Sequence, residues 1–574
     1  MNGRVATAWF NRRDLLRLFP LAALLLLIGP VAAGLAGILL PAFGYLPVLG
    51  RSEFSFEPFR QLIAMPGLAR SAALSLAAGL AATFIAFCIV MLFVAGWRGT
   101  RLFAALEKLI SPLLSVPHAA AAVGLALLIA PSGFLFRLLS PWATGFERPP
   151  DLLIVQDRFG LAMVAGLVVK EMPFILLMTL AALPQVRAGE TERMVAALGY
   201  GRIMGFAHGV LPAVYRQIRL AVLAVVAFST SVVDVALILG PTTPAPLAVR
   251  ILSWQNDADL GLHLVAAAGA LLQVGVTLAA ILVWLLGERV VGMIGRRIAS
   301  AGWRGRADFW LRLVAAGLMI LAAATVLAGI ALLTAWSVAG PWRFPAGLPE
   351  SISLVTWMRV AGSLAAPLWN TTALAASASV IAVALALGSL EFASRQGCDG
   401  PRRWLQTLYV PLIAPQIAFL FGLQILFTFA ALDGTFLALL AVHLVFVFPY
   451  VLLSLSDPWW SWDPRYGHLA RALGRSSAAV FWRVRLPMLT RAVLTAAALG
   501  FAISVGLYLP TLLIGGGRWP TVTTETVALA SGGDSRLIGA TALVQALLPF
   551  LGFALAAVVL AVLFRDRRAM RAAA

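Results

Sequence analysis

Long apolar stretches recur along the whole chain and are separated by shorter polar segments. Each stretch is roughly long enough to cross about 30 Å of hydrocarbon as an α-helix. They fall at 18–41, 71–95, 109–130, 160–183, 217–240 and 262–286, and again at 310–337, 371–394, 405–430, 435–456, 490–515 and 539–564. Helices are expected because each span must satisfy its own backbone polar groups in lipid. The pattern predicts an all-α polytopic helical membrane protein with about twelve transmembrane helices, in two tandem six-helix units.

Composition leads to the same class. Of the 574 residues, 61% are hydrophobic and 12% are charged. A soluble domain of average composition has about a quarter of its residues charged, so a large soluble helical core is a poor alternative. The expected location is the cytoplasmic (inner) membrane of a bacterium, with the lipid bilayer as the solvent of the apolar surface.

The basic residues set the expected orientation. Arg4, Arg12 and Arg13 precede the first apolar run, which is longer than the core of a signal peptide, so we expect a retained first helix. With the N-terminus in the cytoplasm, 31 of the 43 Lys and Arg residues lie in cytoplasmic segments, 11 lie outside, and Lys170 lies in a span. This bias obeys the positive-inside rule and predicts that both termini are cytoplasmic. The net charge of +19 is then a topology signal, and nucleic acid is not expected as a partner.

Two halves are expected. A basic cytoplasmic linker from about 287 to 309 separates a first half, 1–300, from a second, 301–574. Pro112 and Pro117 correspond to Pro411 and Pro415, and each second proline is followed seven residues later by a glycine, Gly124 or Gly422. Pro173 likewise corresponds to Pro449. The first half holds about 25 extra residues, which fit an external loop near 131–159.

A polar loop between the fourth and fifth spans is the most regular part of this repeat. In each half an Ala-rich turn ends in Leu-Gly, and a Leu-Pro follows twelve residues after the glycine, with a constant offset of 275 between the halves. Gly can adopt the left-handed conformation that ends a helix, and Leu-Pro is expected to begin the next one. The product is a helical hairpin on the cytoplasmic face, present twice. Its residues are Ala196, Ala197, Gly199, Leu211 and Pro212 in the first half, and Ala470, Ala472, Gly474, Leu486 and Pro487 in the second.

This spacing resembles the EAA loop of binding-protein-dependent ABC importer permeases, and nearly the whole chain resembles two fused copies of that unit. The resemblance implies that each loop docks on a cytoplasmic ABC ATPase, expected as a homodimer, and that an external solute-binding protein delivers the substrate. Fused permeases of this kind resemble the ferric-iron, thiamine and aminoethylphosphonate group and its uncharacterised relatives. The family's leading glutamate would fall at Arg193 and His468, so the ion pair expected of that glutamate has no counterpart at these positions.

ATP is expected on the partner chain. A phosphate-binding P-loop needs Gly-Lys followed by Ser or Thr. The two lysines, Lys108 and Lys170, follow Glu107 and Val169 instead. The chain is therefore expected to hold no cofactor and to be no enzyme itself, with ATP and Mg²⁺ bound by the ATPase.

Polar residues inside spans are the candidates for the translocation pathway, because ionisable groups in lipid are costly and face the protein interior. Lys170 and Glu171 precede Pro173 and are expected chiefly to anchor their helix. Asp234 is either a pathway residue or a buried structural hydrogen-bond partner, and His443 is expected to be packed in the core. Ser229, Ser504 and Tyr508 complete the pathway candidates. No His/Cys/Asp/Glu cluster has metal-ligand spacing.

Two other classes compete with this interpretation. An ion-driven secondary transporter of twelve spans would need ionisable relays in both halves, and the second half is poor in them. A membrane enzyme would need clustered carboxylates, a metal site or an activated nucleophile. The sequence favours an ABC importer permease over both.

Overall fold

The computed structural model describes residues 15–47, 50–397 and 404–565, so Arg4, Arg12 and Arg13 lie outside the described residues. Helices are the only regular elements found in these ranges. Ten of them are long and apolar enough to cross a membrane, and the number rises to twelve if each of two bent pairs is one span. The expected all-α polytopic class is confirmed.

The twelve expected spans correspond to the longer helices. The first set comprises α2 (Leu18–Ala42), α4 (Leu68–Trp97), α5 (Arg101–Leu113) with α6 (His118–Ile129), α8 (Leu161–Gln185), α11 (Leu211–Ser231) and α14 (Leu260–Ser300). The second set comprises α15 (Phe309–Ser337), α16 (Val355–Arg395), α17 (Val410–Ile413) with α18 (Gln416–Phe429), α19 (Phe436–Trp460), α23 (Thr490–Gly506) and α26 (Ser535–Leu563).

Short helices connect these spans. They are η2 (Leu15–Arg17), α3 (Glu57–Ala64), α7 (Phe134–Leu139), α9 (Ala188–Ala197), α10 (Arg202–Gly205), η4 (Phe206–Val210), α12 (Asp234–Leu239), α13 (Leu247–Gln255), η5 (Trp404–Tyr409), α20 (Pro464–Ala472), α21 (Ser477–Val480), η6 (Phe481–Arg485), α22 (Leu486–Met488), α24 (Leu509–Gly515) and α25 (Val522–Ala530). The expected extra loop of the first half contains α7.

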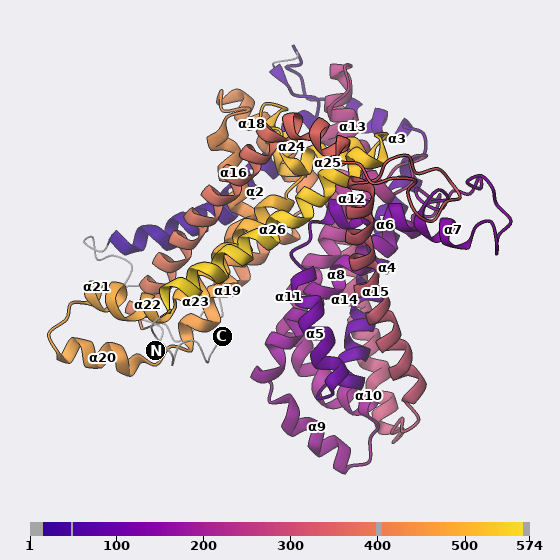
Figure 1. Ribbon diagram of the computed structural model, residues 1–574. Helices are drawn as coiled ribbons and strands as arrows, with labels where there is room; N and C mark the ends of the chain where they lie inside the picture. Colours follow the sequence, from indigo (N-terminus) through magenta and orange to yellow (C-terminus); the bar gives the residue numbers. More distant parts are fainter. Residues whose placement is uncertain (1–14, 48–49, 398–403, 566–574) are drawn as a thin grey trace.

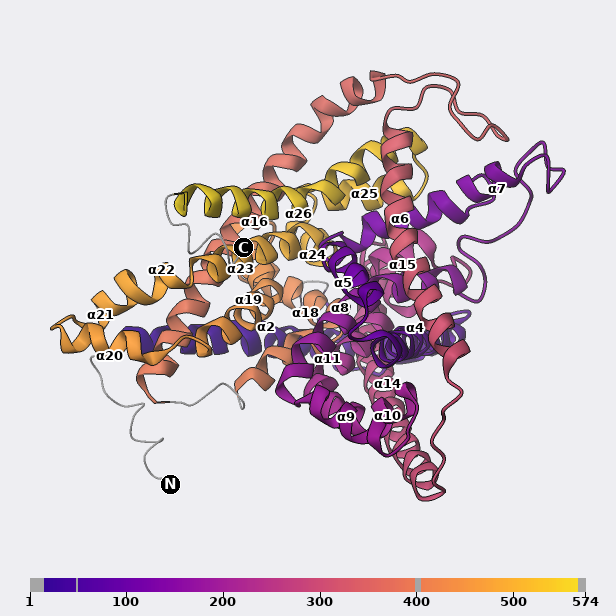
Figure 2. The ribbon, with the colours of Figure 1, turned by 60° about the horizontal axis from the view of Figure 1, so that its bottom comes forward.

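The helices form two groups that meet at one end of the molecule and diverge toward the other (Figure 1). One group contains α4, α8, α11, α14 and α15, and the other contains α2, α16, α18, α19, α23 and α26. Seen from a second direction, the ends that carry α9 and α20 are again far apart (Figure 2). The largest buried apolar cluster spans both groups, so the junction is a continuous core.

The first helix of each half packs on the other half. α2 lies along α18 of the second half, and α15 lies along α4 and α6 of the first half. Both crossings occur at glycines: a Cβ at Gly34 of α2 would overlap the carbonyl oxygen of Phe419, and a Cβ at Gly124 of α6 would lie 2.8 Å from Cα of Gly329 on α15. Gly124 and its repeat partner Gly422 thus serve the same purpose, since Gly422 contacts Gly34. Small residues permit such close backbone approach between membrane helices.

The repeat extends beyond the motifs read from the sequence. With the 275-residue offset, α13 corresponds to α25 at both ends, and the first residues of α14 and α26 coincide. The sequence motifs supported the match only as far as Gly240 and Gly515. The helix boundaries extend the match to the first residue of the last span.

The expected third and fifth spans are wrong in detail. In the third span of each half the helix breaks before the second proline: Pro117 and Pro415 are extended, and α18 is bent by 92° from the preceding segment. A proline and the residue before it disfavour helix continuation. The fifth spans end at Ser231 and Gly506, and after two non-helical residues α12 and α24 begin. Asp234 is therefore the first residue of a short helix and does not lie inside a long one.

The expected linker from 287 is also shorter than predicted, because α14 continues through it to Ser300. Only residues 301–308 connect α14 to α15 without helix. The basic residues between 287 and 300 lie on the exposed side of α14. A polar segment can therefore be the exposed end of a helix, and its polarity alone does not predict a loop.

The need for glycine at the crossing of α2 and α18 can be tested by a substitution that adds a single methyl group. We expect Gly34→Ala to lower the free energy of unfolding by about 1–3 kcal/mol, because the added Cβ meets rigid backbone of α18. Gly29→Ala on the same helix is the control, since nothing lies within 4 Å of a Cβ there. It should leave stability unchanged or raise it by up to about 1 kcal/mol. Thermal unfolding of the purified chain in detergent measures both, and equal effects would contradict the crossing.

Candidate functional site: two hairpins and a central cavity

Each repeated loop forms a helix, a reversal and a second helix. In the first hairpin α9 ends before Gly199, which has φ = +81°; in the second, α20 ends before Gly474, which has φ = +78°. The left-handed conformation expected of both glycines is confirmed. A side chain at either position would strain the backbone, which explains why the reversal needs glycine.

The second helix of each hairpin begins earlier than expected. α10 starts at Arg202 and α21 at Ser477, each nine residues before the Leu-Pro. The second helix of the hairpin therefore does not begin at Leu211 or Leu486, as the sequence predicted. The Leu-Pro instead follows one turn of π-helix, η4 or η6. Proline lacks the N–H that would bond four residues back, and a π turn accommodates this loss without ending the helix.

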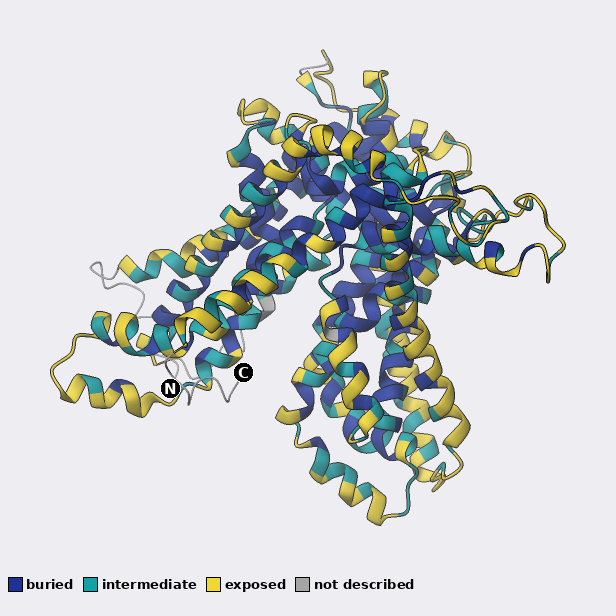
Figure 3. Cartoon of the chain, in the orientation of Figure 1, coloured by how far each residue is buried: buried dark blue, intermediate teal, exposed yellow. Residues whose placement is uncertain are grey.

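Both hairpin helices expose apolar side chains at equivalent positions. Met194 and Leu198 are 66% and 61% exposed, and their partners Leu469 and Leu473 are 63% and 73% exposed. Ala196, Ala197 and Ala472 are exposed beside them, whereas Ala470 is half-buried. α9 and α20 are accordingly among the most exposed helices at the diverging ends (Figure 3). Two matching apolar surfaces of this kind are typical of a protein-docking site.

The first hairpin is anchored to α4 and to the connection between the halves. Arg98, at the end of α4, pairs with Glu192 at 2.7 Å. Asp308 accepts a hydrogen bond of 3.0 Å from the backbone N–H of Ile203, and so caps α10 from outside its own segment. Arg306 donates to the carbonyl oxygen of Gly199 at 3.1 Å. Glu192 thus provides an ion pair, although position 193 holds arginine.

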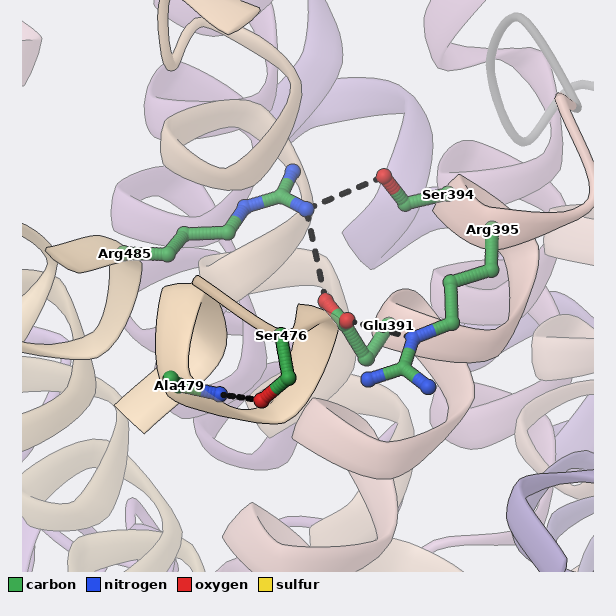
Figure 4. A network of polar contacts seen from close by, with 6 residues as sticks. All are labelled: Glu391, Ser394, Arg395, Ser476, Ala479 and Arg485. Atoms are coloured by element: carbon green, nitrogen blue, oxygen red, sulfur yellow. Dashed lines mark hydrogen bonds and ion pairs between the residues drawn. The ribbon is translucent and has the colours of Figure 1, made fainter. Parts of the chain in front are cut away.

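The second hairpin is anchored differently (Figure 4). Buried Arg485 of η6 lies 3.4 Å from Glu391 of α16, which also pairs with Arg395 at 2.7 Å. Arg485 further donates to Ser394 and stacks 3.7 Å above the ring centre of Trp459. The cap here is local, because Ser476 accepts from the N–H of Ala479 at 3.2 Å. His468 is exposed on α20, and no hydrogen bond or ion pair joins its side chain to the described residues.

A cavity of about 210 Å³ lies where the two helix groups meet. It is lined from the first half by the break before α6, by α8, α11 and the break before α12, and from the second half by α18, α19, α23 and the break before α24. Non-helical backbone is tolerated at membrane depth where it borders a cavity. Asp234 and Tyr508, two of the expected pathway residues, lie in this lining.

The carboxylate, imidazole and ammonium groups of the described cavity lining all come from the first half. Lys170 donates to the carbonyl oxygens of Leu113, Leu114 and Val116 in the break before α6. Glu171 lies 3.6 Å from His118. The expected anchoring role of Lys170 and Glu171 is compatible with these contacts, and both also line the cavity.

Corresponding positions in the second half are uncharged. Matching Pro173 to Pro449 pairs Lys170 with Phe446, and matching Pro117 to Pro415 pairs His118 with Gln416. His118 was missed in the sequence, although it directly follows the repeated proline. Phe174 and Tyr450, which occupy equivalent positions, meet across the junction with ring centres 6.4 Å apart.

Ser229, Ser504 and His443 lie outside the lining. His443 is buried and bonds Ser504 at 2.8 Å and Thr511 at 3.0 Å, which ties α19 to α23 and α24. The hydroxyl of Ser229 is buried and has no partner among the described residues. Of the four pathway candidates, the structure brings only Asp234 and Tyr508 to the cavity.

Comparison with known proteins identifies the family. No family model matches the chain. The inner membrane ABC transporter permease protein YnjC of Escherichia coli strain K12 is 32% identical over 488 residues, which cover 84% of this chain and 85% of that protein. The chain belongs to the ABC transporter permeases. A shorter match, 26% identical over 165 residues, relates 29% of the chain to 62% of the spermidine/putrescine transport system permease protein PotC of Haemophilus influenzae. The name of YnjC and the apolar helices of this chain support a multi-pass transport subunit of the inner membrane.

The helix caps at Asp308 and Ser476 lie in different hairpins of this permease, so we expect the removal of each cap to affect only its own hairpin. We expect Asp308→Ala to speed amide exchange about fivefold in residues 199–206 only, because losing a cap costs about 1 kcal/mol. Ser476→Ala should do the same in residues 474–481 only. Hydrogen–deuterium exchange of the full chain in detergent compares them, each variant serving as the other's control. Exchange that rises in both hairpins with either variant would show that the caps are not local.

Proposed function

We propose that this permease forms the translocation pathway of an ATP-driven importer and is coupled to a separate cytoplasmic ATPase through its two hairpins. The matched hairpins with exposed apolar residues carry the proposal. They sit at the ends of two helix groups that diverge, where a partner with two equivalent sockets would hold both. ATP and Mg²⁺ are bound by that partner, an ATPase homodimer.

The orientation follows from the same arrangement. The hairpins and both chain ends face the cytoplasm, as the distribution of basic residues indicates. The start of α2 supports this, because Phe19 packs against Gly388 near the end of α16, close to the second hairpin's anchor at Glu391. A solute released by an external binding protein enters at the converging end and reaches the cavity.

Coupling is a change in the angle between the two helix groups. Closure of the ATPase dimer brings the hairpins together, and the groups pivot at the junction where the cavity lies. The ion pairs at Glu192 and Glu391 make each hairpin move with its own group. Such coupling requires that the ATPase contact the two states differently, and a spacing between its sockets that differs between the open and the closed ATPase dimer provides this.

Secondary transport is not favoured by the cavity. An ion-driven mechanism would need titratable relays in both halves, and the described lining has ionisable carboxylates, imidazole and ammonium groups from the first half only. Transport that continues without ATP and stops with an uncoupler would contradict the ATP-driven proposal.

Docking can be tested at the exposed apolar positions. We expect Met194→Asp and Leu469→Asp each to weaken co-purification with the cognate ATPase about tenfold or more, because burial of such a side chain contributes about 1.5–3 kcal/mol. Leu348→Asp, at a position 78% exposed between α15 and α16, is the control and should bind normally.

The free chain should keep its thermal stability in all three variants, since these side chains face solvent. If Met194→Asp and Leu469→Asp retain ATPase binding and ATP-dependent uptake in proteoliposomes, the hairpins are not the docking surface.

A further inference from the structure

The cavity has one carboxylate that the protein leaves available. Asp234 is 9% exposed and lines the cavity, at the break between α11 and α12. The carboxylate lies against the backbone N–H groups at the start of α12. No cationic or hydroxyl side chain among the described residues forms an ion pair or hydrogen bond with it. A buried carboxylate is costly unless a cation approaches it.

The other charged groups of the cavity already have partners. The ammonium group of Lys170 is taken up by three backbone carbonyl oxygens, and Glu171 is paired with His118. Lys170 and His118 are near enough to Asp234 to act on it electrostatically, but neither bonds it. An incoming anion would meet no free cation, whereas an incoming cation would meet Asp234.

Apart from Ser115 and Gln416, the rest of the lining is apolar and aromatic. Phe174, Phe228, Phe446, Tyr450 and Tyr508 all contribute to it. The faces of such rings attract organic cations, most strongly where water is excluded. Tyr508, which is adjacent to the repeat partner of Asp234, lies close enough to interact with the Asp234 carboxylate. The cavity therefore combines a counter-ion with aromatic walls.

Its size and charge limit the ligand further. A volume of about 210 Å³ is below the range of about 300–1,000 Å³ common for drug-sized ligands. A single available carboxylate balances one positive charge, so the site does not match a polyamine that carries several ammonium groups.

Resting on the transport function proposed above, we propose that the cavity binds a small organic monocation, a quaternary ammonium or protonated amine, with Asp234 as its counter-ion and the aromatic side chains around it. The second half contributes no charged side chain to the described lining of the cavity and completes its apolar wall. The charged side chains of the cavity, all from the first half, then determine which class of substrate the transporter accepts.

The test compares ligands that differ only in charge. The full chain, purified in detergent, is titrated with choline and with 3,3-dimethyl-1-butanol, in which carbon replaces the charged nitrogen; methylphosphonate provides an anion. A ligand that binds the native state raises the unfolding temperature in a concentration-dependent way. We expect choline to raise it at concentrations at least about tenfold lower than the isostere, and methylphosphonate to have no effect. Equal responses to choline and its isostere, a stronger response to methylphosphonate, or no response to choline would overturn the proposal.

Variants assign the effect to the carboxylate. We expect Asp234→Asn to weaken choline binding about tenfold or more, and Asp234→Glu to keep the preference for the cation. Asp151→Asn, which removes an exposed carboxylate outside the cavity, is the control and should bind as the native chain does. Choline binding that survives Asp234→Asn would overturn the assignment. If that variant does not fold, the choice between choline and its isostere by the native chain still decides the proposal.

This assay contains no ATPase, so its failure is distinguishable from failure of the coupling proposal. Loss of ATPase docking with normal charge selection would leave the cavity assignment standing. Normal docking with no charge selection would leave only the coupling assignment standing.

Discussion

The close approach of glycine backbones between the first helix of one half and the third span of the other is the contact on which the architecture depends. Gly34 with Gly422, and Gly124 with Gly329, let α2 and α15 cross to the opposite half. In lipid the hydrophobic effect does not drive helices together, so tight van der Waals contact must do so. The exchange builds each helix group from both halves, and the two groups meet at one end while their other ends remain apart.

Under the coupling proposed above, the cavity and the hairpins lie at opposite ends of the two helix groups. The cavity lies at the junction, where small relative rotations change its walls. The hairpins lie at the far ends, where the same rotation is largest. Each hairpin must be rigidly attached to its group for this to work, and Arg98–Glu192 and Arg485–Glu391 supply the attachment. The Arg485–Glu391 pair is buried and therefore strongly position-specific, because breaking it would leave an uncompensated charge.

The halves match in backbone and differ in chemistry. Helix boundaries repeat with the offset of 275, yet one hairpin is capped by Asp308 of the connecting segment and the other by its own Ser476. Gly201 stands where the second half has Ser476, because a Cβ there would overlap the carbonyl oxygen of Gly305. The segment that joins the halves therefore packs on the first hairpin and leaves no room for a side chain at position 201. The cavity shows the same divergence, because the positions of the second half that are equivalent to Lys170, Glu171 and Asp234 hold uncharged residues.

The sequence by itself determined the membrane class, the two halves, the hairpin positions and the left-handed glycines. Each of these depends on local composition or on short-range conformational preference, which a single chain displays directly. It also marked Asp234 and Tyr508, because polar side chains within a long apolar stretch are visible in the pattern, whereas the breaks beside them were not predicted. Only the tertiary structure decided that Arg485 pairs with Glu391 and that His118 reaches Glu171, since these contacts join residues 94 and 53 positions apart. The same holds for the crossing of α2 and α15, because the partner of a small residue on an apolar helix depends on which helix packs against it.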